Sequence, residues 1–193
     1  MLTELWSWLL RIGYQPYFSH IGPNIDCPNA TATDVVENVR RAHRETGKPV
    51  TIIGHSLGGM LARSAALNHP EYVKQIISLA SPFRDHVRAH PAVLAAIDSI
   101  RAWGRGSAAT SNIHPTCFSG HCTCDFVKNV LKPEGFAVPR YAIYSRTDGV
   151  VDWESCLEAD DRLNVEVNAT HIGMVFNVEV YCALAGLLAG KDC

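Results

Sequence analysis

Short apolar, β-branched runs alternate along the chain with longer segments in which apolar residues recur at helical spacing. The short runs predict strands at 14–18, 50–53, 73–79, 141–144 and 164–167. The longer segments predict helices at 2–11, 34–45, 60–68, 87–103, 125–131 and 175–188. Strands that alternate with helices form right-handed crossovers and a parallel sheet. The pattern therefore predicts an α/β protein of three layers, with helices on both faces of a mostly parallel central sheet.

Capping residues predict the ends of the helix at 34–45. Thr33 is the expected N-cap, Glu37 lies in the first turn, and Gly47 is the expected stop. A loop rich in Gly, Pro and Asn, from 21 to 30, is expected to precede this helix.

Residues 84–138 interrupt the alternation of strands and helices. They contain one long helical pattern, a Gly/Ser/Thr stretch, a cysteine-rich turn and a second short helical pattern. We expect residues 1–193 to form one domain in which 84–138 are a small helical insert over one edge of the sheet. The insert is expected to act as a partial lid.

Composition narrows the class of protein further. The 193 residues include 17 Lys and Arg against 19 Asp and Glu, so the formal charge is −2 and no basic surface for nucleic acid is expected. No apolar stretch approaches the roughly 18 residues of a membrane span, and the N-terminus lacks a signal-peptide pattern. Seven cysteines cannot all pair within one chain. These features favour a cytoplasmic protein.

The strongest chemical signal is the run Gly54-His55-Ser56-Leu57-Gly58-Gly59, directly after the apolar strand 50–53 and before a helix. A Gly-x-Ser-x-Gly turn between a strand and a helix exposes the serine Oγ above the sheet, and its glycines keep side chains out of the bend. Ser56 is therefore the expected nucleophile. The N–H of Leu57, at the start of the helix, is the expected donor to an oxyanion.

A nucleophilic serine needs a histidine base and a carboxylate that orients the base. Asp148 follows the strand 141–144, and His171 follows the strand 164–167. Both loops are expected at the carboxyl edge of the sheet, beside Ser56. Asp152 is the competing acid, but Asp148 is closer to the end of its strand.

Two further residues are candidates for substrate contact. His55 is expected to point away from Oγ and to form a wall of the site. Trp153 comes shortly after Asp148 and could line an acyl pocket.

The cysteines of the insert do not have the spacing of a zinc site. Cys122 and Cys124 are too close in sequence for easy tetrahedral ligation, and no second pair of cysteines lies nearby. Free thiols, or a disulfide within the insert or to Cys156, remain as alternatives. We expect no metal and no cofactor.

Four segments resemble the α/β-hydrolase family, in particular its lipase- and esterase-like bacterial members. They are 54–59, 77–83, 144–153 and 168–174, which are similar to the nucleophile turn, the strand after it, the acid segment and the histidine loop of that family. The resemblance implies ester hydrolysis through an acyl-enzyme, with Ser56 attacking, His171 moving the proton and Asp148 orienting His171.

The resemblance fails at one point. Members of the family take a second oxyanion N–H from a loop after an early strand, and this chain begins at the helix that follows that loop. In the family, the missing strand lies between those expected here at 14–18 and 50–53. A late start codon, repair by a partner or by the chain's termini, and a weakly active remnant are all open explanations. If the gap limits turnover, restoring upstream sequence should raise activity at least tenfold.

Three functions follow as hypotheses. The first is hydrolysis of a small-molecule or lipid ester. The second is acyl transfer to an alcohol or amine by the same three residues. The third is a remnant that binds a partner or a lipid, or forms a homodimer, through the unpaired sheet edge. Concentration-dependent dimerisation without esterase activity would favour the third.

Overall fold

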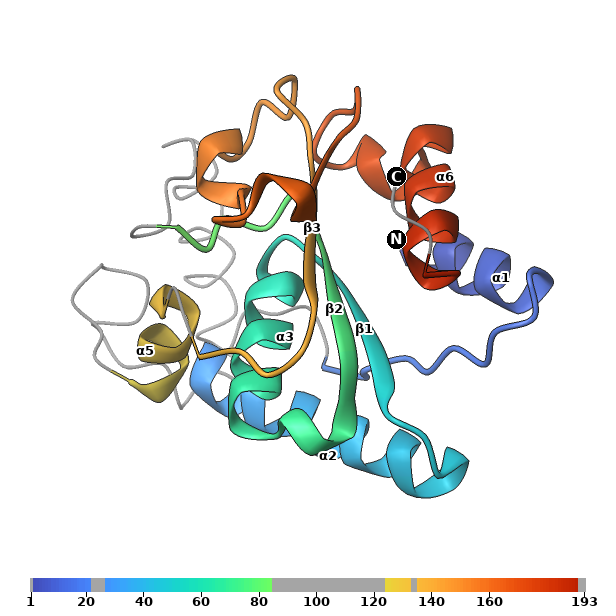
Figure 1. Cartoon of the computed structure of the whole chain (residues 1–193), viewed down its shortest axis with the longest axis vertical. Coiled ribbons are helices and arrows are strands. Elements are labelled where there is room, and N and C mark those ends of the chain that lie inside the picture. The colour runs from blue at the N-terminus through green and yellow to red at the C-terminus, as the bar shows by residue number, and fades with distance from the viewer. Residues whose placement is uncertain (1, 22–26, 85–123, 133–134, 191–193) are drawn as a thin grey trace, which may run out of the picture.

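The computed structural model describes residues 2–21, 27–84, 124–132 and 135–190. In this part of the chain, one parallel sheet has the strand order β1-β2-β3-β4, so each strand pairs with its neighbour in sequence (Figure 1). The strands are β1 (Val50–His55), β2 (Val73–Leu79), β3 (Arg140–Tyr144) and β4 (Asn164–Glu166). The predicted parallel sheet is confirmed.

Helices cover both faces of the sheet, as Figure 1 shows. One face carries α1 (Thr3–Arg11) and α6 (Val178–Leu188), and the other carries α2 (Pro28–Thr46), α3 (Leu57–Asn68) and α5 (Asp125–Leu131). Among the residues that the structure describes, the connections include the 3-10 turns η1 (Pro70–Tyr72), η3 (Trp153–Cys156), η4 (Asp161–Leu163) and η5 (Gly173–Phe176). Within the described residues, no helix is both long enough and apolar enough to cross a membrane.

The alternation of side chains along the strands divides the core into two halves. Ile76 and Ala142 pack with α2, α3 and α5, whereas Ile77 and Ile143 pack with α1 and α6 on the opposite face. All four side chains are buried. A strand that is apolar on both faces must be covered on both, which explains the three layers.

The helix expected at 34–45 is longer than predicted. It begins at Pro28, whose missing N–H costs nothing in a first helical turn. Its last residue is Thr46, and Gly47, with φ 66°, caps it. Thr33 is therefore not the N-cap. Its Oγ1 donates instead to the carbonyl of Asn29, one turn earlier, at 3.3 Å. The predicted loop 21–30 is therefore wrong at residues 28–30, which belong to α2.

The strand expected at 14–18 is also wrong, because this segment has no main-chain ladder in the described structure. The Trp6 indole N–H donates to the Pro16 carbonyl at 3.2 Å, and the Asn38 amide donates to the Ser19 carbonyl. Pro16 also has no N–H to contribute to a ladder. Side chains thus bind the polar groups that a neighbouring strand would otherwise pair.

The remaining differences are small. The helix expected at 175–188 divides into η5 and α6 at Asn177, whose side chain accepts from the N–H groups of Glu179 and Val180. The helix expected at 87–103 lies outside the described residues. The end of the predicted insert, α5, packs against α2 and α3 through Phe126 and Val130.

Candidate active site

Ser56 occupies a strained turn between β1 and α3. Its backbone has φ 53° and ψ −123°, a conformation that residues with a Cβ rarely adopt. The turn is held by the Ser56 N–H, which donates to the Leu79 carbonyl of β2 at 2.8 Å. Strain of this kind persists where surrounding structure enforces it, and it is common at functional sites.

Two glycines make this turn possible. A Cβ on Gly54 would overlap the main chain of Gly58, across the bend. A Cβ on Gly59 would overlap Oγ of Ser81 and would lie 2.7 Å from its Cβ. The chain can therefore reverse within this space only because both positions have no side chain.

Leu57, the predicted oxyanion donor, is the first residue of α3. N–H groups in the first turn of a helix have no acceptor within the helix, and the helix dipole adds partial positive charge there. The N–H of Leu57 is thus positioned beside Ser56 at an end of the helix that favours negative charge.

Asp148 lies in the turn after β3. Its carboxylate is buried, and both of its oxygens have hydrogen-bond partners. Oδ1 accepts from the N–H groups of Val150 at 2.9 Å and Val151 at 2.8 Å, and Oδ2 lies 2.8 Å from Nδ1 of His171. Burial works to raise the pKa of Asp148, but the hydrogen bonds from His171, Val151 and Val150 outweigh it, and the pKa falls below its usual value. Asp148 is therefore held as a carboxylate that faces His171.

His171 lies in the loop after β4 and is buried. Its main-chain N–H donates to the Asp148 carbonyl at 3.1 Å, so these two residues are joined by backbone as well as side chain. Because Nδ1 faces the carboxylate, it carries the proton, and Nε2 is left as the basic ring nitrogen.

His55 joins the serine turn to the histidine loop. Its Nε2 lies 2.9 Å from the carbonyl oxygen of His171, and the two ring centroids are 4.7 Å apart. A carbonyl only accepts, so His55 donates from Nε2. Burial, and then the nearby His171, lower the pKa of His55. Since Ser56 is the next residue, this contact brings the turn and the loop together.

The other two sequence candidates have different partners. Asp152 caps η3, where its Oδ1 accepts from the N–H of Glu154 at 3.1 Å. Trp153 stacks on Tyr144, with centroids 5.7 Å apart and planes 21° apart, and the guanidinium of Arg146 lies 4.1 Å from the Trp153 ring centroid. The carboxylate on His171 is thus that of Asp148, not of Asp152.

Ser145 and Thr147 also support the site, and our sequence analysis did not identify them. Oγ of the buried Ser145 accepts from the N–H of Ala169 at 3.1 Å, and Oγ1 of Thr147 donates to the Asn168 side chain at 3.0 Å. These bonds fix the loop after β3 to the loop that carries His171. Their position at a strand end, beside the predicted acid, was the available signal.

Cys156 is a buried free thiol. Burial, followed by the charge of Asp148, raises its pKa to about 12, so it stays protonated and unreactive. The alternative of a disulfide to Cys156 is therefore wrong. Cys117 and Cys122 lie outside the described residues.

A parallel sheet with a serine turn after one strand, and an acid and a histidine after later strands, defines the α/β-hydrolase fold. The chain is an α/β-hydrolase-fold protein. Residues 17–106 match a family model described as the alpha/beta hydrolase fold. A search of curated protein sequences found no match.

Solved structures of this fold resemble the chain throughout most of its length. A thermophilic esterase is 18% identical, with a TM-score of 0.56 over 84% of this chain and 73% of its own. The lipase BlEst2 of Bacillus licheniformis is 15% identical, with a TM-score of 0.59 over 84% and 75%. An extracellular α/β-hydrolase from a Paenibacillus species is 15% identical, with a TM-score of 0.57 over 99% and 93%. At these identities the similarity concerns the fold.

Proposed function

We propose that the protein hydrolyses carboxylic esters through a covalent acyl-enzyme on Ser56. The observation that carries this proposal is the 2.8 Å contact between Nδ1 of His171 and Oδ2 of Asp148, in a loop that His55 joins to the serine turn. A buried carboxylate on Nδ1 makes Nε2 the base, which is what a serine nucleophile requires. The esterase and lipase among the similar structures add support for this class of substrate.

The proposed reaction proceeds in two stages. Ser56 Oγ attacks the ester carbonyl while its proton passes to Nε2 of His171, and the Leu57 N–H donates to the oxyanion that forms. Nε2 then returns the proton to the alcohol as the carbon–oxygen bond breaks. Water attacks the acyl-enzyme by the same route and releases the acid. Asp148 remains ionised and stabilises the imidazolium in both stages.

We place the acyl chain beside Trp153, which the stack on Tyr144 holds in one orientation. The substrate class is then a small-molecule or lipid ester of short to medium acyl length. Most of the insert predicted at 84–138, which the sequence suggested as a partial lid, lies outside the described residues.

The first test is hydrolysis of p-nitrophenyl esters from acetate to palmitate by the chain and by Ser56→Ala. We expect turnover by the chain and a loss of about 10⁶-fold in kcat for the variant. Ser7→Ala, on α1, is the matched control and should retain full activity. Equal rates for the chain and Ser56→Ala would overturn the proposal. Adding glycerol separates hydrolysis from acyl transfer, because only transfer yields a glycerol ester.

The choice of acid has its own test. Asp148→Asn should lower kcat by about 10⁴-fold, since an amide cannot stabilise the imidazolium or hold the correct tautomer. Asp152→Asn is the matched control, because asparagine can still accept from the N–H of Glu154 and cap η3. A greater loss for Asp152→Asn than for Asp148→Asn would reverse the assignment.

A further inference from the structure

The loop that carries His171 leaves the sheet directly after β4. That strand ends at Glu166, and one more bond, from the Val167 N–H to the Tyr144 carbonyl at 2.9 Å, continues the pairing. In the described part of the chain no strand lies beside residues 168–171, which we call the histidine loop. A base works only if its ring nitrogen stays in place, so the groups that hold this loop matter to the reaction.

Both main-chain groups of Asn168, the first residue of the histidine loop, are bound by side chains at the start of α6. The N–H donates to Oε2 of Glu179 at 2.8 Å, and the carbonyl accepts from Nδ2 of Asn177 at 3.0 Å. A neighbouring strand binds main-chain N–H and C=O groups in the same way. The side chains of α6 therefore hold the loop where the sheet stops holding the chain.

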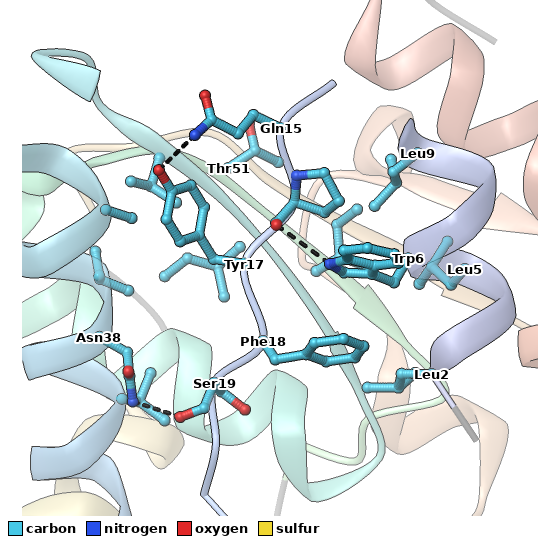
Figure 2. Close-up of a pocket in the computed structure, with 17 residues that line it drawn as sticks. Leu2, Leu5, Trp6, Leu9, Gln15, Tyr17, Phe18, Ser19, Asn38 and Thr51 are labelled. Atoms are coloured by element: carbon cyan, nitrogen blue, oxygen red, sulfur yellow. Dashed lines mark hydrogen bonds between the residues drawn. The ribbon is translucent and has the colours of Figure 1, made fainter. Parts of the chain in front are cut away.

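The same device holds an extended segment near the N-terminus, as Figure 2 shows. There the Trp6 indole N–H binds the carbonyl of Pro16, and the Asn38 amide binds the carbonyl of Ser19. Each of these bonds holds one carbonyl through an uncharged donor. Asn168 has two groups bound, and one of its partners is a carboxylate. Hydrogen bonds to an ionised group are about twice as strong as those between neutral groups, so Asn168 is held more firmly.

Asn177 performs two tasks with the two ends of one amide. Its Oδ1 accepts from the N–H groups of Glu179 at 2.7 Å and Val180 at 3.3 Å, which caps α6. Its Nδ2 is then the atom that faces the loop. The helix behind it is fixed in the core, because Val180 and Leu184 are buried there with Ile143. A firmly placed helix thus determines where the histidine loop begins.

The route from α6 to the reacting atoms is short. Asn168 precedes His171 by three residues, and Nδ1 of His171 lies 2.8 Å from Oδ2 of Asp148. A shift of the loop at Asn168 changes this contact and the direction of Nε2. Displacement of a reacting group by about 1 Å can lower the rate by about 100-fold. The side chains at the start of α6 need not touch the substrate for such an effect.

We propose that Asn177 and Glu179 are positioning residues for His171, and that they act through the main chain of Asn168. They keep the base aligned with Asp148 and with the serine turn. This inference rests on the proposed function, in which His171 is the base. Removing either side chain should slow the chemical step and leave substrate binding unchanged.

Asn177→Ser separates positioning from capping. Serine is as good an N-cap as asparagine, because its oxygen still accepts from the first turn of the helix, but it has no amide to donate to Asn168. We expect kcat to fall about tenfold, with KM changed by less than about twofold and the urea midpoint of unfolding unchanged. Loss of an interaction that serves only the transition state has this signature.

Ala185→Gly is the matched control for the stability of α6. Ala185 is exposed in the second half of the helix, and glycine there weakens a helix without removing a contact of the loop. We expect a lower urea midpoint and an unchanged kcat. A loss of kcat as large as that of Asn177→Ser would overturn the proposal, since general loosening of α6 would then explain both variants.

Substitutions at Glu179 test the second bond. Glu179→Ala should also lower kcat about tenfold, whereas Glu179→Gln retains an oxygen that accepts from the Asn168 N–H and should recover most of the loss. Equal losses in the alanine and glutamine variants would overturn the positioning role of Glu179, because the carboxylate would then act through its charge.

A nuclear magnetic resonance signal tests the position of the base without turnover. The proton on Nδ1 of His171, bonded to Asp148, gives a low-field resonance, which is assigned by its loss in Asp148→Asn. We expect this resonance to shift or broaden in Asn177→Ser and Glu179→Ala, and to stay unchanged in Ala185→Gly and Glu179→Gln. An unchanged resonance in Asn177→Ser would overturn the proposal whether or not the chain hydrolyses esters. A shifted resonance in a chain without turnover would support the positioning role and contradict the proposed function alone.

Discussion

His55 shows how one side chain can position another through the backbone. Its Nε2 donates to the main-chain carbonyl of His171, so it fixes the position of the histidine loop through the backbone. His55→Phe removes the donor and should lower kcat/KM by about 10- to 100-fold, since displacement of a base by about 1 Å has an effect of that size. His55→Gln keeps an N–H donor and should recover most of the loss. Equal losses in both variants would contradict this role.

The lowered pKa of His55 also predicts a dependence of stability on pH. In the unfolded chain His55 binds a proton near its ordinary pKa of 6.5, whereas the folded chain resists protonation until a lower pH. The contribution of neutral His55 is therefore complete above pH 6.5 and is lost as the pH falls through the folded pKa. Urea unfolding at pH 7 and pH 5 should show a larger fall in free energy for the chain than for His55→Gln. Parallel falls in both proteins would contradict the shift.

Gly59 and Gly58 are adjacent but have different surroundings. Gly59→Ala would place a Cβ against Ser81, whereas a Cβ on Gly58 meets nothing within 4 Å. We expect Gly59→Ala to lower the free energy of unfolding by about 1–3 kcal/mol and Gly58→Ala to have no comparable cost. Thermal or urea unfolding measures both. Combining Gly59→Ala with Ser81→Gly should restore part of the loss, and no restoration would argue against the clash.

At the scale of elements, a buried cluster of charged side chains joins α3 to β3 and to the segment that follows β3. Glu158 contacts Arg63 of α3 and, at 3.2 Å, Arg140 of β3. The Arg63 guanidinium carbon lies 3.9 Å from the Phe83 ring centroid. Burial lowers the pKa of Arg63 to about 10, although Glu158 opposes the shift. Arg63 and Glu158 are almost entirely buried, so the attraction between them must offset the water that each side chain has lost.

Glu158→Gln should therefore lower the free energy of unfolding by about 3–5 kcal/mol, because it leaves buried guanidinium groups without their carboxylate. Glu37→Gln is the matched control. Glu37 pairs with Arg40 and Arg44 on the exposed surface of α2, where the expected cost is below about 1 kcal/mol. Similar costs for both variants, measured by urea unfolding, would contradict the role of the cluster.

The elements that the sequence predicted well are those defined by local pattern. The bounds of β2 and α5 agree with the predicted 73–79 and 125–131. The segment 14–18 was predicted as a strand because its residues favour extended backbone. Extension alone does not make a strand, and the contacts from Trp6 and Asn38 come from elsewhere in the chain. Such contacts have no signature in the pattern of a short segment.

At the scale of the whole molecule, one rule of topology brings the candidate site together. The carboxyl ends of parallel strands meet at one edge, so a serine, an acid and a histidine after three strands were expected to be near one another. That rule could not choose between Asp148 and Asp152. The choice depends on the turn after β3, where the N–H groups of Val150 and Val151 hold the Asp148 carboxylate toward His171. The role of His55 depends on a contact between residues far apart in sequence, which no local pattern could indicate.

The sequential strand order also has a consequence for the path of folding. Val50 pairs with Val73 across α3 and the short turn η1, whereas Ile76 of β2 pairs with Arg140 across a much longer stretch of chain. Closing a longer loop costs more entropy, so the β1–α3–β2 unit is expected to form early and β3 to dock later. Pulsed hydrogen exchange during refolding should protect the Gly54 amide before that of Ile143. The serine turn would then be complete while its acid and its base are still unfolded, and the chain would become competent for catalysis only at the last step of its folding.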